Sequence, residues 1–194
     1  MPANKVLPKF AFDSTSFIDW VKEDKKYFRE LLAIINKAKD RELDIVASVN
    51  TIYETLKCFE DGSMTEEEQL KKTSNILFGN VFVIPVPFDV ECAMVARNLR
   101  IQDKTIKTLG TSDLLCLATA IRYGCDFLIT RDGSGKDKGL IHFSGATVKP
   151  YPPQKIITPR DWADQYAGMF KGIGDLPKVA TEKEESDTKS GLDF

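Results

Sequence analysis

Apolar residues along the chain occur in two kinds of stretch, short runs of strand length and longer segments with helical spacing. The short runs are rich in Val, Ile and Phe and are bounded by polar residues, Gly or Pro, which is typical of β-strands. We predict strands at Val6–Phe12, Asp44–Ala47, Val81–Pro85, Asp126–Thr130 and Ala146–Val148, the last at an edge of the sheet.

The longer segments carry apolar residues at steps of three and four positions, with charged residues between them. This spacing places the apolar side chains on one face of a helix. We predict helices at Phe17–Lys39, after Ser48 or Asn50, at Thr65–Phe78, from Pro87 or Asp89 to Leu99, and from Thr111 to Gly124. Strands that alternate with helices predict a three-layer α/β/α sandwich with a central, mainly parallel sheet.

The predicted strands and main helices all lie within residues 1–150, which we expect to form one α/β domain. Residues 151–174 follow as a Pro-rich segment with a short C-terminal helix around Trp162–Tyr166. Residues 175–194 contain six acidic side chains against three Lys and few apolar residues, so we predict a disordered acidic tail there.

Composition narrows the classes of protein. With 194 residues, of which 42% are hydrophobic and 29% charged, the chain can form one compact domain with a short appendage. The net charge of -2 excludes a polybasic nucleic-acid binder, although it does not exclude an enzyme that acts on nucleic acid. A mean hydropathy of -0.23 excludes a membrane-embedded protein.

Cysteine and histidine usage argues against a zinc site. The four cysteines form no CxxC pair and lie in apolar stretches, so we predict buried thiols in a reducing compartment: Cys58, Cys92, Cys116 and Cys125. His142 is the single histidine, which excludes mechanisms that need two. The N-terminus shows no signal peptide, and we expect a cytoplasmic location.

Acidic residues stand where parallel strands end. Asp13 and Asp132 directly follow predicted strands, Glu54 lies on the helix after the second strand, and Asp113 opens the helix that leads into the fourth. Because ligands of open parallel sheets bind beyond the carboxyl ends of the strands, we predict that these carboxylates converge. Taken singly, each acid has a structural alternative as a solvated turn residue or a helix cap.

Four converging carboxylates repel one another and stay ionised together only around a cation. A site built of carboxylate oxygens selects Mg²⁺ or Mn²⁺ over zinc. Such an ion delivers an activated water and neutralises charge on a phosphodiester. The pattern therefore indicates a metal-dependent nuclease.

Three blocks of the sequence resemble PIN-domain nucleases. Residues 10–20 are similar to the opening strand and metal-binding Asp of that family, and residues 45–54 to its second strand, Ser and helical Glu. Residues 111–132 are similar to its Asp-helix-Gly-strand-Thr-Arg-Asp/Asn run. The resemblance spans about residues 5–150 and implies an α/β/α fold, Mg²⁺ or Mn²⁺, and endoribonuclease activity on RNA. Many relatives are toxins of toxin–antitoxin modules.

The resemblance assigns roles residue by residue. Asp13, Glu54, Asp113 and Asp132 would be the catalytic, metal-binding quartet, and Thr130 would hold its hydroxyl near the metal or orient a carboxylate. It further implies an antitoxin protein as a partner, and a homodimer formed through the helices at Lys22–Lys39 and Thr65–Phe78. The chain is longer than the compact toxins, and its loop after Asp132 lacks their Asp-Phe pair.

Basic residues near the predicted site are candidates for binding substrate. Lys104 and Lys107 precede Asp113, and Arg131 stands between two site residues, so we predict contacts with RNA phosphates. Solvated surface positions are the alternative for the two lysines. Two other functions stay open: a non-catalytic PIN-like module that binds RNA or protein, and a nucleotide-binding regulatory domain, which we rank last because GxGxxG is absent.

Overall fold

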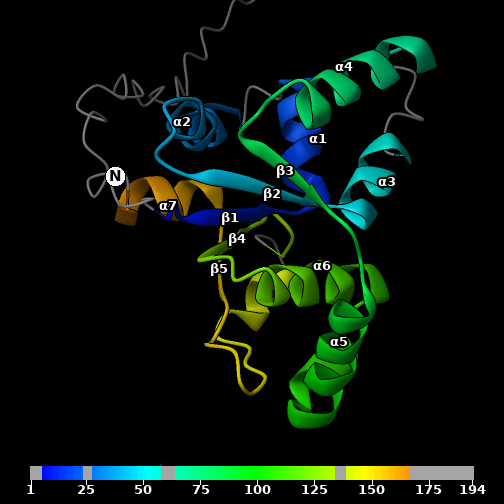
Figure 1. Ribbon diagram of the computed structural model, residues 1–194, viewed down its shortest axis with the longest axis vertical. Coiled ribbons are helices and arrows are strands. Elements are labelled where there is room, and N and C mark those ends of the chain that lie inside the picture. The colour runs from blue at the N-terminus through cyan, green and yellow to red at the C-terminus, as the bar shows by residue number, and fades with distance from the viewer. Residues whose placement is uncertain (1–5, 24–27, 58–63, 134–138, 167–194) are drawn as a thin grey trace, which may run out of the picture.

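The computed structural model describes residues 6–23, 28–57, 64–133 and 139–166. Within these ranges, five strands form one parallel sheet in the order β3-β2-β1-β4-β5 (Figure 1). The strands are β1 (Lys9–Phe12), β2 (Asp44–Ser48), β3 (Val83–Val86), β4 (Phe127–Ile129) and β5 (Lys155–Ile157). Because all pairs are parallel, the carboxyl ends of the strands share one edge of the sheet.

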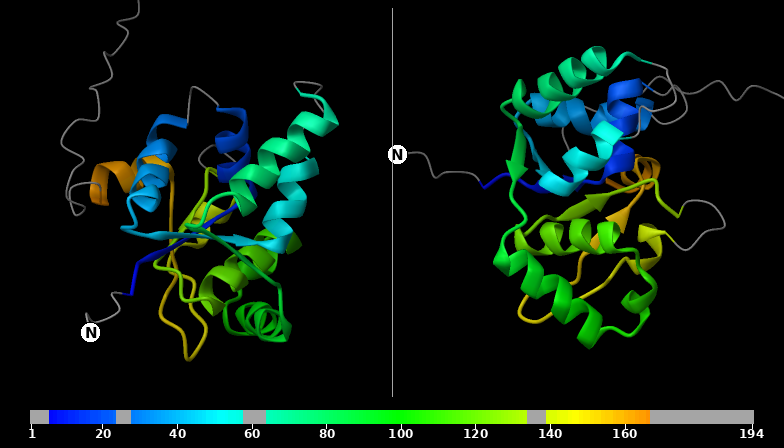
Figure 2. Two further views of the ribbon diagram at one scale, coloured as in Figure 1. Left: turned by 45° about the horizontal axis from the view of Figure 1, so that its top comes forward. Right: turned by 90° about the vertical axis from the view of Figure 1, so that its right-hand side faces the viewer.

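Helices cover both faces of this sheet. They are α1 (Ser14–Lys22), α2 (Phe28–Lys39), α3 (Val49–Lys57), α4 (Glu66–Phe78), α5 (Val90–Gln102), α6 (Thr111–Arg122) and α7 (Pro159–Tyr166). In Figure 1, α1, α2 and α4 lie above the sheet and α5 and α6 below it, and Figure 2 shows the same layers from two other directions. The predicted three-layer α/β/α sandwich with a parallel sheet is therefore confirmed.

The alternation of side chains along β1 separates two hydrophobic cores. Phe10 and Phe12 belong to the core between the sheet and the helices α1 and α2. Ala11 belongs to the core on the opposite face, between the sheet and the helices α5 and α6. β2 and β4 alternate in the same way, since Val46 and Leu128 share the core of Ala11. A sheet buried on both faces needs apolar residues at successive positions, which explains the continuous apolar runs of the sequence.

The helix predicted over Phe17–Lys39 is wrong as one element. The structure has α1 and α2 in its place, and α1 ends at Glu23 with φ 53°, a left-handed conformation that stops a helix. Glu23 is an unusual residue for this position, where Gly is the common signal. Other helix ends follow the sequence signals, since Thr65 and Glu68 form a capping box on α4 and Gly124 follows α6 with φ 64°.

The edge strand predicted at Ala146–Val148 is also wrong. The backbone of Ala146 accepts a hydrogen bond from Gln154 instead of pairing with β4. The strand beside β4 is β5, which comes after the prolines that had indicated the end of the sheet. The helix predicted to end at Leu99 runs on to Gln102 as α5, and a short 3-10 turn follows it at Thr105–Thr108 (η1).

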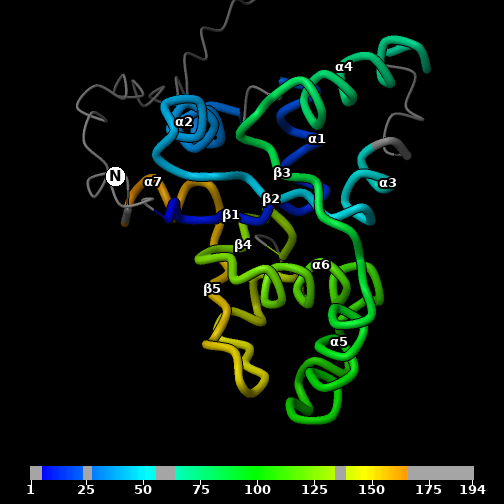
Figure 3. The backbone as a smooth tube through the Cα atoms, in the orientation of Figure 1, coloured from blue at the N-terminus to red at the C-terminus, as the bar shows by residue number. Residues whose placement is uncertain are grey.

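The C-terminal helix predicted near Trp162 is α7, and it is part of the core. Trp162 is fully buried, and its ring meets Phe10 edge to face at 5.9 Å between centroids. The smooth backbone path in Figure 3 shows the chain returning to the sheet through β5 before it enters α7. The division into residues 1–150, 151–174 and 175–194 stays a prediction, and the tail lies outside the described residues.

Replacing Trp162 tests how far α7 contributes to the stability of the sheet. Trp162→Phe is expected to lower the free energy of unfolding by about 1–2 kcal/mol, well below the ~3–5 kcal/mol typical of truncation to Ala. Urea unfolding followed by circular dichroism measures the difference. The control is Val81→Ala, at a side chain that is 75% exposed. Equal stability of both variants would contradict a core role for α7.

No helix in the described ranges has both the length and the apolar character needed to cross a bilayer.

Candidate active site

Asp13 lies at the carboxyl end of β1 and caps α1. Its carboxylate accepts a hydrogen bond from the Ser16 backbone N–H at 2.9 Å, so the cap interpretation of this residue is correct. The residue is only 5% exposed. Burial raises the pKa of Asp13, and hydrogen bonds from Thr130, Ser16 and Thr15 act in the opposite direction. A cap alone does not require such a dense set of donors.

Three hydroxyls surround this carboxylate. Thr130 follows β4, and its hydroxyl donates to Asp13 Oδ2 while accepting the Asp132 backbone N–H at 2.9 Å. Thr15 Oγ1 lies 2.8 Å from Asp13 Oδ1, and Ser16 Oγ lies 2.9 Å from the same atom. The predicted role of Thr130 in orienting a carboxylate agrees with this geometry. Thr15 and Ser16 were not predicted, although hydroxyls two and three positions after a capping Asp are a recognisable local signal.

Asp132 is held by the backbone beyond it. Its Oδ2 accepts the Leu140 N–H at 2.7 Å, and its carbonyl accepts the Ile141 N–H at 3.2 Å. Gly139 packs so closely that a Cβ there would lie within 2.5 Å of Asp132 Cγ. Gly139 and Leu140 therefore lie directly against the Asp132 carboxylate.

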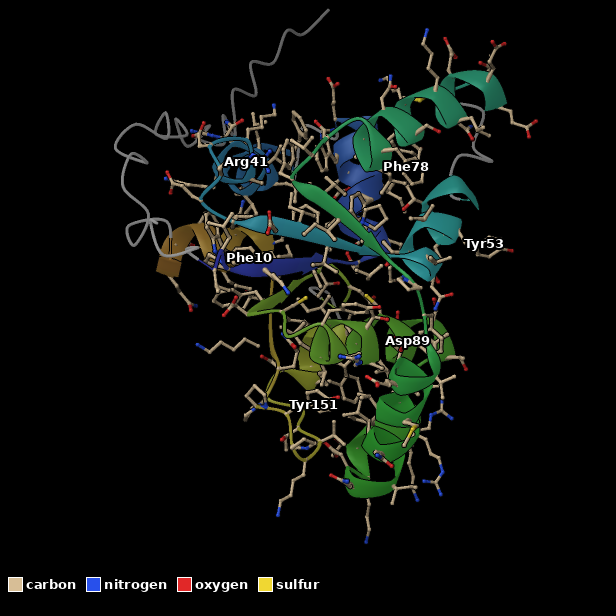
Figure 4. The ribbon with its side chains drawn as sticks, viewed as in Figure 1. Phe10, Arg41, Tyr53, Phe78, Asp89 and Tyr151 are labelled. Carbon is tan, nitrogen blue, oxygen red and sulfur yellow. The ribbon has the colours of Figure 1, made fainter. Side chains whose placement is uncertain are left out.

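Glu54 and Asp113 come from helices on the two sides of the sheet edge. Glu54 lies on α3, beside Tyr53, whose side chain extends into solvent (Figure 4). Ser112 at the start of α6 donates a hydrogen bond to Glu54 Oε1, which joins the two helices. Ser112 was not predicted, because only the folded chain brings residues 54 and 112 together.

The four predicted acids form one electrostatic cluster. The pKa of Asp113 is raised to about 6, first by burial and then by the charges of Asp132, Asp13 and Glu54. The negative charge of each of the other three carboxylates thus acts on Asp113. Its position in the first turn of α6 favours negative charge, but repulsion and burial outweigh this effect.

The donor set fits a hard divalent cation. Carboxylate oxygens are its preferred ligands, and a cation among them would remove the repulsion that raises the pKa of Asp113. In residues 6–23, 28–57, 64–133 and 139–166, no three or more His, Cys, Asp or Glu side chains are already grouped as a metal site.

The predicted basic residues have different surroundings. Lys104 and Lys107 are exposed at η1, just before α6. Arg131 instead forms two hydrogen bonds with Asp19 on α1, at 2.6 and 2.7 Å. Their contacts with RNA stay a prediction.

The described cysteines are buried thiols, as predicted: Cys92, Cys116 and Cys125. Cys116 is buried near three of the acids, Asp13, Asp113 and Glu54. Its burial, and then the charges of these carboxylates, raise the pKa of its thiol well above the usual range. Cys58 lies outside the described residues.

The fold and the site together indicate the class of protein. The domain is an all-parallel α/β/α sandwich, and four acidic residues interact at one edge of its sheet. The PIN domain family model matches residues 11–138, well over half of the chain. The chain therefore belongs to the PIN domain family. No curated protein was found to match it by sequence.

Solved structures share the fold at low sequence identity. A chain of VapBC2 from Rickettsia felis bound to a promoter DNA fragment is 16% identical, with a TM-score of 0.56 over 77% of this chain and 98% of that one. DNA-bound VapBC from Salmonella typhimurium is 17% identical, with a TM-score of 0.56 over 79% and 99%. VapC20 from Mycobacterium tuberculosis, a Sarcin-Ricin loop cleaving toxin, is 9% identical, with a TM-score of 0.50 over 64% and 91%. This likeness is one of fold.

Proposed function

We propose that the protein is a metal-dependent endoribonuclease that hydrolyses RNA phosphodiester bonds with Mg²⁺ or Mn²⁺. The observation that carries the proposal is the placement of four acids at one edge of the sheet, where burial and then the charges of the other three carboxylates raise the pKa of Asp113 to about 6. A cluster of uncompensated acids lowers stability, and a cation bound among them would remove this cost.

The residues that would hold the ion are Asp13, Glu54, Asp113 and Asp132. A bound divalent ion supplies a water of lowered pKa and neutralises charge on the phosphate. Thr130, Thr15 and Ser16 orient the Asp13 carboxylate, and Ser112 orients that of Glu54. Lys104 and Lys107 would attract the RNA backbone from the exposed side of η1.

Membership of the PIN domain family and the fold shared with VapC20, described as a Sarcin-Ricin loop cleaving toxin, support RNA as substrate. The fold shared with VapBC structures supports a role as the toxin of a toxin–antitoxin pair, with an antitoxin protein as partner. A homodimer through α2 and α4 is part of this proposal, and exposed Leu70 and Phe78 on α4 are compatible with it. A cytoplasmic location is also part of this proposal.

The test uses the purified full chain with matched single-stranded RNA and DNA oligonucleotides. Cleavage of RNA is expected with Mg²⁺ or Mn²⁺, none with EDTA, and full recovery when Mn²⁺ is added in excess. In parallel, Mn²⁺ is expected to raise the melting temperature of the protein alone, because an ion that binds only the folded state stabilises it.

The same experiment separates the alternative function. A non-catalytic PIN-like module would bind RNA without cutting it and would show no specific shift with Mn²⁺ or Mg²⁺. That combination of results would refute the nuclease proposal. Cleavage of the DNA alone would leave the metal site standing and refute RNA as the substrate.

A further inference from the structure

Arg131 stands between two residues of the acidic site, yet its guanidinium bonds elsewhere. Nε lies 2.6 Å from Asp19 Oδ2 and Nη2 lies 2.7 Å from Asp19 Oδ1, a two-bond pairing that matches the planar fork of Arg. Asp19 is only 2% exposed. The pair is therefore a largely buried link between α1 and the chain after β4.

The backbone of Arg131 makes a second link to the same helix. Its N–H donates to Thr15 Oγ1 at 3.1 Å, and Thr15 Oγ1 lies 2.8 and 2.9 Å from the two carboxylate oxygens of Asp13. Thr15 lies in the first turn of α1, and Asp19 lies one turn further on. Two attachment points one turn apart fix both the position and the rotation of a helix.

These two links act where the pairing of β1 with β4 ends. Phe12 and Ile129 are the last paired residues of the two strands, and one further backbone bond runs from the Asp13 N–H to the Ile129 carbonyl at 3.2 Å. Side-chain contacts place the chain that follows. Asp13 follows one strand, and Thr130 and Asp132 follow the other. Arg131 joins these two segments, and together with the Thr130–Asp13 bond it holds three of the site residues in place.

We infer that Arg131 is a positioning residue, which holds α1 against the end of β4 through Asp19 and Thr15 and so keeps Asp13 in register with Thr130 and Asp132. This role replaces the contact with an RNA phosphate predicted from the sequence. The edge of the guanidinium that carries Nε and Nη2 is held by a buried carboxylate, so this edge does not face a phosphate. The inference rests on the proposed nuclease function.

A double-mutant cycle distinguishes positioning from phosphate binding. Arg131→Lys and Asp19→Asn are each expected to lower kcat about 100-fold, the scale of a displaced catalytic group, with KM for RNA unchanged within about twofold. The double variant is expected to lose no more than either single one, because both remove the same pair. Each variant is also expected to raise the Mn²⁺ concentration that gives half of the thermal shift.

Phosphate binding predicts a different pattern. Arg131→Lys, which keeps the positive charge, would then preserve most activity, and Asp19→Asn would leave kcat unchanged while a change at Arg131 raised KM. Either result overturns the inference. The control is Glu42→Gln, which breaks the 2.8 Å pair with Lys37 at the opposite end of β2 and should lower stability without changing kcat.

The second link gives an independent test if Asp19→Asn does not fold. Thr15→Val removes the hydroxyl that connects Arg131 to Asp13, whereas Thr15→Ser keeps it. The Val variant is expected to lose kcat and the Ser variant to retain it; equal activity overturns the inference. If the wild-type protein shifts with Mn²⁺ but does not cut RNA, the proposed function alone fails, and the half-saturating Mn²⁺ concentration decides the role of Arg131.

Discussion

Asp113→Asn is expected to make the metal-free protein more stable and at the same time to abolish RNA cleavage. In the wild-type protein, burial and three neighbouring carboxylates disfavour the charge on Asp113 and raise its pKa to about 6. Asn has nearly the same shape without the charge, so the repulsion disappears. The proposed metal site loses one of its four carboxylates, and cleavage should fall by at least about 1,000-fold.

The size of the stabilisation follows from the pKa. A carboxyl whose pKa rises from 3.8 to about 6 costs about 3 kcal/mol when it is ionised in the folded state. Asp113 is half-buried, so solvent screening reduces this to about half. Asn also loses the favourable charge in the first turn of α6, worth about 0.5 kcal/mol. The net gain of about 1 kcal/mol corresponds to about 2–4 °C in melting temperature.

The pH dependence of this difference has a defined sign. Because the folded-state pKa of Asp113 is above 3.8, the folded protein binds a proton more tightly than the unfolded chain. The wild-type protein therefore recovers stability as the pH falls through about 6, and the advantage of the Asn variant shrinks and vanishes below about 4. Thermal melts of both proteins at pH 7.5, 6 and 4 in EDTA measure this difference in stability.

Manganese is expected to reverse the order of stability. The wild-type protein should gain from the ion and the Asn variant should not, so the wild-type protein becomes the more stable of the two. The control is Asp126→Asn, because Asp126 is an exposed acid at the other end of β4. If Asp113→Asn lowers the stability of the metal-free protein, the electrostatic cluster is contradicted. If the same variant still cuts RNA with Mn²⁺, the assigned site is contradicted.

Gly139→Ala is expected to lower activity about 100-fold through Asp132. Gly139 has φ -89°, which any residue adopts, so its backbone conformation is no obstacle. The obstacle is contact, since a Cβ at this position would overlap the carboxylate of Asp132 and the backbone N of Gly133. Either Asp132 or the backbone must move, at a cost of about 1–3 kcal/mol in stability.

Gly124→Ala separates this effect from ordinary strain. Gly124 has φ 64°, and a Cβ there would meet nothing within 4 Å. This variant should lose about 1–2 kcal/mol from left-handed strain and keep its kcat. Steady-state cleavage and urea unfolding of both variants give the comparison. Loss of kcat in both, or in neither, would show that Gly139 does not control the position of Asp132.

Local patterns were sufficient to predict most of the fold. β1, β2 and β4 are continuous apolar runs because they are buried on both faces. β5 was missed because it has only three residues and follows Pro152 and Pro153, which commonly end a sheet. The break between α1 and α2 was missed because Glu23 takes a conformation that its residue type does not indicate.

The acids were predictable because parallel strands end at one edge, so Asp13 and Asp132 had to lie on the same side of the sheet. The groups that orient them were less accessible. Thr130 came from the family pattern, whereas Ser112 and Gly139 act through contacts that exist only after folding. The surroundings of Arg131 required the position of Asp19, which no spacing along the chain reveals.

The pairing of β1 with β4 has a consequence for the order of events during folding. Thr130 bonds to Asp13 across 117 positions of the chain, so closing this contact carries the entropy cost of a very long loop. Local elements such as α4 with its capping box can form much earlier. We therefore expect the acids to come together late, so an incompletely folded chain would have separate carboxylates and no metal site.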